Sequence, residues 1–96
     1  DSMTYGLRAG LIIIRTYMLK YKLTTIHSIV SRWAPPKENN TDAYVKSVSS
    51  MMKMHALQTF DFGDRGRIVA LVSAMCKVET GITIDQKLIE SAYDLL

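Results

Sequence analysis

Apolar residues recur at the spacing of one helical turn in every long segment of this chain of 96 residues. In the first segment, from about Thr4 to Tyr21, the apolar residues at positions i, i+4, i+7 and i+11 are Leu7, Leu11, Ile14 and Met18. This spacing places them on one face of a helix. No segment shows the alternation of apolar and polar residues that marks a half-buried strand, so we expect an all-α fold.

Capping and stop signals divide the rest of the chain into four further helices. Thr24 or Thr25 can cap a short second helix, which ends before two consecutive prolines because the residue before a proline is driven out of the helical region. Asn40 or Thr41 can cap the third helix. We therefore predict a compact bundle of about five short helices.

The signals for the last two helices follow an aspartate and a glycine. Asp64 is placed to cap a fourth helix that runs through Val78, and Gly81 is a suitable stop. Thr83 with Gln86 forms a capping-box pattern that opens the fifth helix. The length suits one domain over residues 1–96, and the chain can be a fragment of a longer protein.

Charge and cysteine usage exclude several classes of function. The net charge is +3, but the basic residues are scattered, so we expect no nucleic-acid partner. The single cysteine, Cys76, and two distant histidines provide no metal ligand set, and we predict neither a metal nor a cofactor. The apolar run Gly10–Ile14 is too short to cross a bilayer and lacks the pattern of a signal peptide.

The segment RWAPPKENNTDAY is the least ordinary part of the sequence, because it joins two aromatic residues through a rigid polar loop. Trp33 and Tyr44 flank the loop, and Glu38, Asn39 and Thr41 supply polar side chains. Aromatic faces cover the C–H surface of a sugar while polar groups bind its hydroxyls, so these five residues form a candidate binding site. Alternatively, the aromatic residues belong to the core and the polar residues only tie the loop.

Glu79 is the candidate catalytic residue. It extends the apolar line of Ile68, Val72 and Met75 and lies near the end of its helix, where the macrodipole opposes a negative charge. Both features favour the neutral carboxyl that a general acid for glycoside cleavage requires. The alternative is a solvated carboxylate in a frayed last turn.

Three blocks of the sequence resemble a phage- and prophage-encoded family of virion or structural proteins. They are YGLRAG, TTIHSIVSRWAPPKENNTDAYVKSV and AMCKVETG, which span Tyr5–Gly10, Thr24–Val48 and Ala74–Gly81. In that family a GIRA-like start, an RWAPP-x-EN-x-T-x-x-Y centre and an E-N-G-like end occur in this order, and Thr80 stands where the family often has Asn. An upstream NPGNIR-like segment of the family is absent here. The resemblance implies a protein of the virion or of the bacterial host cell, with virion proteins or cell-wall glycan as partners.

Two of these blocks are also similar to lysozyme-like lytic transglycosylases. ENNTDAYVKSV resembles their E-T-x-x-Y-V segment, and AMCKVETG resembles their catalytic A-I-I-x-x-E-S-G stretch, which would make Glu79 the general acid. The two occur here in reversed order. The sequence therefore favours a virion-associated structural or glycan-contacting module without catalysis of its own. The alternatives are a cell-wall glycosidase fragment and a helical protein-interaction module that uses Met51, Met52 and Met54.

Overall fold

Five α-helices and their connections make up the computed structural model, which describes residues 2–96. The helices are α1 (Ser2–Leu19), α2 (Ile26–Trp33), α3 (Thr41–Met52), α4 (Arg65–Thr80) and α5 (Gln86–Asp94). The described residues contain no strand, so the predicted all-α fold is confirmed. The Cα radius of gyration is 12.3 Å, as expected for a compact chain of this length.

Side chains at the helix starts explain most of the boundaries. Thr25 and Ser28 form a capping box at the start of α2, with each side chain accepting a hydrogen bond from the other's backbone amide at 3.1 Å. The Asn40 side chain accepts from the Ala43 amide at the start of α3, and Asp64 accepts from the Arg67 amide at the start of α4. The predicted caps at these three helices are confirmed.

Four predicted helix boundaries differ from the structure. The first helix begins and ends two residues earlier than predicted, and the turn that follows it is made by Lys22 with φ of 59°. The fourth helix continues past Val78 to Thr80, and Gly81 then ends it with φ of 73°. The Thr83–Gln86 capping box is wrong, because the Asp85 side chain caps α5 by accepting from the Lys87 amide at 3.0 Å.

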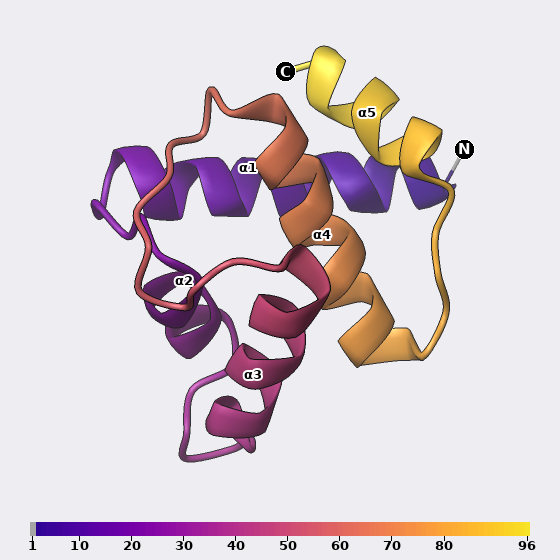
Figure 1. The fold of residues 1–96 in the computed structure, drawn as a ribbon. Coiled ribbons are helices and arrows are strands. Elements are labelled where there is room, and N and C mark those ends of the chain that lie inside the picture. The colour runs from indigo at the N-terminus through magenta and orange to yellow at the C-terminus, as the bar shows by residue number, and fades with distance from the viewer. Residues whose placement is uncertain (1) are drawn as a thin grey trace.

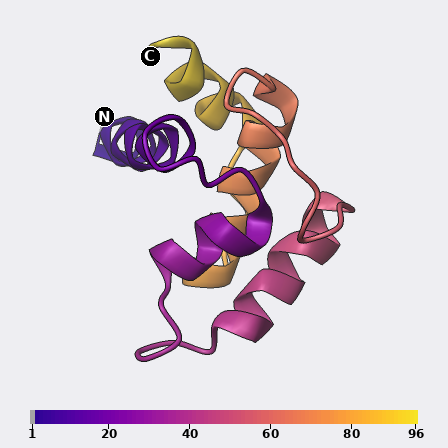
Figure 2. The ribbon, with the colours of Figure 1, turned by 90° about the vertical axis from the view of Figure 1, so that its left-hand side faces the viewer.

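The α4 helix occupies the centre of the molecule and packs against α3 on one side and α5 on another. The α1 helix runs across the direction of α4 and packs mainly against α5 (Figure 1). Figure 2 shows α1 and α3 at opposite sides of the molecule with α4 between them. The fully buried side chains at the centre include Leu11, Ile29, Val48, Ile68 and Leu71.

Hydrogen bonds hold the connection before α4 against the start of α2 and hold α5 against the start of α4. The Phe60 amide donates to the Thr24 carbonyl at 3.0 Å, which ties the connection to the entry of α2. The Tyr93 hydroxyl donates to the Phe62 carbonyl at 2.7 Å, and Arg65 binds both carboxylate oxygens of Asp94. These contacts join α5 to the start of α4.

Candidate functional site

An apolar cavity of about 150 Å³ lies between α1 and α4, with the end of α2 at its edge. We call it the α1–α4 cavity. It is lined by Gly6, Leu7, Gly10 and Ile14 of α1, by Trp33 of α2, and by Val72, Met75, Cys76, Glu79 and Thr80 of α4. Two of the residues singled out from the sequence, Trp33 and Glu79, thus lie in one cavity although they are far apart along the chain.

The two glycines of α1 leave the space on that side of the cavity. A Cβ atom built on Gly6 or Gly10 meets no atom within 4 Å, apart from the backbone of its own helix and its chain neighbours. The close approach of a neighbouring backbone therefore does not explain these glycines. Each costs about 1 kcal/mol relative to alanine inside a helix, and the missing side chains open the wall of the cavity.

Tyr44, which is not among the residues that line the cavity, has a buried hydroxyl group. Its side chain belongs to the core, at 7% exposure, and no described group forms a hydrogen bond with its hydroxyl within ordinary distance and angle limits. Burial raises the pKa of Tyr44 far above its usual range, and the charge and acceptor oxygens of Glu79 raise the pKa further. Glu79 therefore lies near the hydroxyl, and because it is exposed, a rotation of its side chain can bring the two groups into contact.

Cys76 lines the same cavity as Glu79. Burial raises the pKa of the Cys76 thiol, and the Glu79 carboxylate raises the pKa further. A thiol with a raised pKa holds less of the nucleophilic thiolate at neutral pH. This environment gives Cys76 the character of an apolar wall residue.

The loop between α2 and α3 places the other predicted binding residues differently. Glu38 and Asn39 are exposed, and the Asn39 amide donates to the Pro35 carbonyl at 3.2 Å. Thr41 is buried and its hydroxyl donates to the Ala34 carbonyl, so it ties the two ends of the loop. Glu38, Asn39 and Thr41 are not among the residues that line the α1–α4 cavity.

Tyr44 is too buried to be a surface platform for a sugar, whereas Trp33 keeps part of its surface exposed. Trp33 is half-buried and packs against the core, while Tyr44 is buried within it. Trp33 and Glu79 line the same cavity, and the charge of Glu79 acts on the Tyr44 hydroxyl, whereas the loop residues Glu38 and Asn39 do not line that cavity. No pattern in the sequence indicates that Gly6, Gly10 and Cys76 line this cavity as well, because that depends on how α1 crosses α4.

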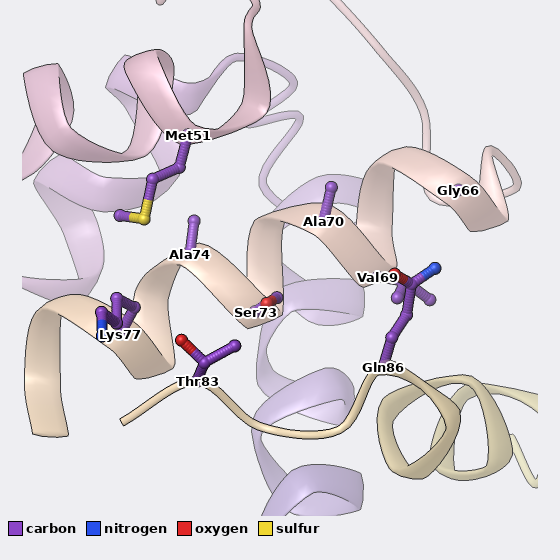
Figure 3. Close-up of a pocket in the computed structure, with 9 residues that line it drawn as sticks. All are labelled: Met51, Gly66, Val69, Ala70, Ser73, Ala74, Lys77, Thr83 and Gln86. Carbon is purple, nitrogen blue, oxygen red and sulfur yellow. The ribbon is translucent and has the colours of Figure 1, made fainter. Parts of the chain in front are cut away.

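A second groove, of about 290 Å³, runs along another side of α4 (Figure 3). Met51 reaches it from α3, and Thr83 and Gln86 reach it from the connection to α5 and from α5 itself. Its cationic residue, Lys77, donates to the Gly81 carbonyl at 2.8 Å and so caps the end of α4. The groove holds none of the predicted site residues, and we place the candidate site in the α1–α4 cavity.

The methionines proposed as an adaptable surface are divided between different environments. Met51 is 44% exposed and lines the open groove, whereas Met52 is half-buried and Met54 is buried. The three side chains therefore do not share one exposed face. No group of three or more potential metal ligands occurs among residues 2–96.

A comparison with known proteins relates the chain to a phage protein. It is similar to Protein P5 of Pseudoalteromonas phage PM2, with 38% identity over 77 residues. This chain has a phage relative. The matched segment covers 80% of this chain and 46% of Protein P5, so the chain spans about half the length of that curated relative.

The three sequence blocks predicted a relationship to phage proteins, and this similarity confirms that relationship. No protein-family profile matches the chain, and no solved structure matches it. Within residues 2–96, no helix combines the length and apolarity needed to cross a bilayer. The virion role, the RWAPP motif family and the likeness to lytic transglycosylases remain predictions.

The buried hydroxyl of Tyr44 leads to a prediction about stability and pH. We expect Tyr44→Phe to raise the free energy of unfolding by about 1 kcal/mol at pH 7, because a buried donor without a partner is removed. The raised pKa adds a second effect. The folded chain disfavours the phenolate, so stability is full below the usual pKa of 10.0 and is lost as pH rises above it. Tyr44→Phe should weaken that loss.

Urea unfolding of the parent and the variant at pH 7 and pH 11 measures both effects. Tyr5→Phe is the matched control, because Tyr5 is 73% exposed and the change should leave both values nearly unaltered. A loss of stability at pH 7 in Tyr44→Phe would show that the hydroxyl has a stabilising partner and would contradict the prediction.

Proposed function

We propose that this chain is a helical module of a phage protein that contacts bacterial cell-wall glycan at the α1–α4 cavity and does not cleave it on its own. The observation that supports this most is the placement of Trp33 and Glu79 on the same cavity. An indole can cover the C–H face of a sugar ring, and a carboxylate can accept hydrogen bonds from its polar groups. The similarity to a phage protein supports the phage association, with virion proteins as further partners.

The number of carboxylates at the cavity argues against catalysis by the chain alone. Glycoside hydrolases of the common type use two carboxyl groups, about 5–10 Å apart, on either side of the scissile bond. Glu79 is the one acidic residue among those that line the cavity, and Glu38 lies on the exposed loop. A glycosidase that uses Glu79 as general acid would need a second group from outside this cavity or a mechanism that dispenses with it.

Retention on purified cell-wall sacculi tests the proposal. We expect the parent chain to sediment with sacculi and Trp33→Ala to be retained roughly tenfold less, because loss of one aromatic stacking contact is worth about that factor. Glu38→Gln is the control for a carboxylate away from the cavity and should be retained like the parent. Equal retention of the parent and Trp33→Ala, or no retention of either, would overturn the proposed contact.

The release of soluble muropeptides in the same incubation distinguishes a non-catalytic module from a glycosidase. We expect no release above the background of sacculi alone, either by the parent or by Glu79→Gln. Release by the parent that is abolished in Glu79→Gln would replace the proposal with the glycosidase alternative. Circular dichroism of each variant shows whether a lost signal reflects unfolding.

A further inference from the structure

The α1–α4 cavity combines three features that together define the kind of group it can hold. Its walls are apolar side chains such as Leu7, Ile14 and Met75, so the part of a ligand that enters must be apolar and small. Glu79 lines the cavity, and its ionised carboxylate offers hydrogen-bond acceptors but no donor. The buried Tyr44 hydroxyl beside Glu79 has no hydrogen-bond partner within the described chain.

We infer that the α1–α4 cavity receives the acetamido group of an N-acetylated amino sugar, with the methyl group inside and the amide N–H donating to Glu79. This inference rests on the proposed function and names the group recognised at its site. Trp33, at the edge of the cavity, then lies where it can cover the sugar ring. Tyr44 is a positioning residue in the complex: its hydroxyl, which has no partner among the described residues of the free chain, donates to the Glu79 carboxylate once that exposed side chain has rotated toward it.

Other common groups fit this set less well. A carboxylate would be repelled by Glu79, and an ammonium group would lose its hydration against the apolar walls without enough acceptors to replace it. A hydroxyl group offers a donor but leaves the apolar space unfilled. The acetamido group has an apolar methyl end and an N–H donor a short distance apart. The methyl group suits the apolar walls, and the N–H suits the Glu79 carboxylate.

Gly6 and Gly10 provide an independent reason to regard the cavity as a site. Both lie within α1, where glycine is unfavourable, and neither has a neighbour that a side chain would strike. Larger side chains at these positions would occupy the space between α1 and α4. The glycines therefore keep open a cavity that packing alone would favour closing.

Binding of a defined oligosaccharide tests the inference. The probes are the tetramer of N-acetylglucosamine and the same tetramer without its acetyl groups, titrated into the full chain by calorimetry or amide chemical-shift mapping. We expect the acetylated tetramer to bind at least tenfold more tightly, with the largest shifts around Gly10, Trp33 and Glu79. Equal binding of the two tetramers, or no binding of the acetylated one, would overturn the inference.

Substitution of one glycine provides the matched test within the protein. Gly10→Leu fills the cavity from α1 and should lower the affinity for the acetylated tetramer at least tenfold. Gly66→Leu is the control, because Gly66 also lies in a helix but lines the other groove. Unchanged affinity in Gly10→Leu, with its helical spectrum intact, would show that the tetramer binds elsewhere.

Tyr44→Phe separates positioning from packing. We expect it to remain folded and to bind the acetylated tetramer several-fold more weakly, but to cause no further loss when Glu79 is already replaced by Gln. An equal loss in the presence and absence of the Glu79 carboxylate would overturn the positioning role. Retention on sacculi without any preference for acetylated glycan would overturn this inference and leave the proposed function intact, whereas lack of retention would overturn both.

Discussion

Leu71→Ala should lower the free energy of unfolding by about 2–5 kcal/mol, the largest effect that we expect from a single substitution in this chain. Leu71 has no solvent-exposed surface and lies on α4, the helix that packs against both α3 and α5. Truncation removes buried apolar contacts and leaves a void that closely packed neighbours fill only in part. For a chain of this size the midpoint of thermal unfolding should fall by roughly 10–25 °C.

Leu19→Ala is the matched control for this change. Leu19 is the last residue of α1 and is 57% exposed, so the same truncation should change the free energy of unfolding by about 0.5 kcal/mol or less. Thermal unfolding followed by circular dichroism at 222 nm measures both variants. Similar midpoints for the two variants would contradict the central position of α4 in the core.

Thr41→Val should cost about 1–3 kcal/mol, although valine has nearly the same shape as threonine. The Thr41 side chain is buried, and its hydroxyl donates to the carbonyl of Ala34 across the loop between α2 and α3. Valine removes the donor and leaves that carbonyl without this partner inside the protein. The loss should loosen residues 35–40, so we expect faster amide exchange there than in the parent.

Two controls separate the hydroxyl from other properties of the residue. Thr41→Ser keeps a donor in the same place and should recover most of the lost stability. Thr83→Val makes the same change at an exposed position and should have little effect. If Thr41→Val is as stable as the parent but binds glycan less well, Thr41 is a ligand contact and its role as a loop tie is wrong.

The helical fold could be predicted because its determinants are local. The periodic apolar residues of α1 and the side chains of Thr25, Asn40 and Asp64 act within one or two turns of their own helix. The start of α5 was harder, because Asp85 and Thr83 both suit a cap and the fold uses Asp85. The end of α1 depends on the left-handed conformation of Lys22, which its side chain does not signal.

The candidate site could be predicted only in part, since it depends on contacts between helices. Trp33 and Glu79 were each predicted from the residue type and the neighbouring sequence. That both line one cavity depends on how α2 and α4 pack. The alternative interpretation of the loop assigned Tyr44 to the core, without indicating that its hydroxyl would lie near Glu79. Arg32, which lies over the rings of Tyr17 and Tyr21, was likewise visible only in the structure.

The packing of α1 against α5 has a consequence for the order in which the chain can fold. During synthesis α1 leaves the ribosome before the other described helices, yet the helix that covers it most is the last of the five. The neighbours α2, α3 and α4 can associate while the apolar face of α1 still lacks its cover. Contacts between distant parts of a chain form slowly because the intervening segment must first be brought into place. The nascent chain therefore carries an exposed hydrophobic helix until α5 is made, and this interval is when it is most open to capture by chaperones or to aggregation.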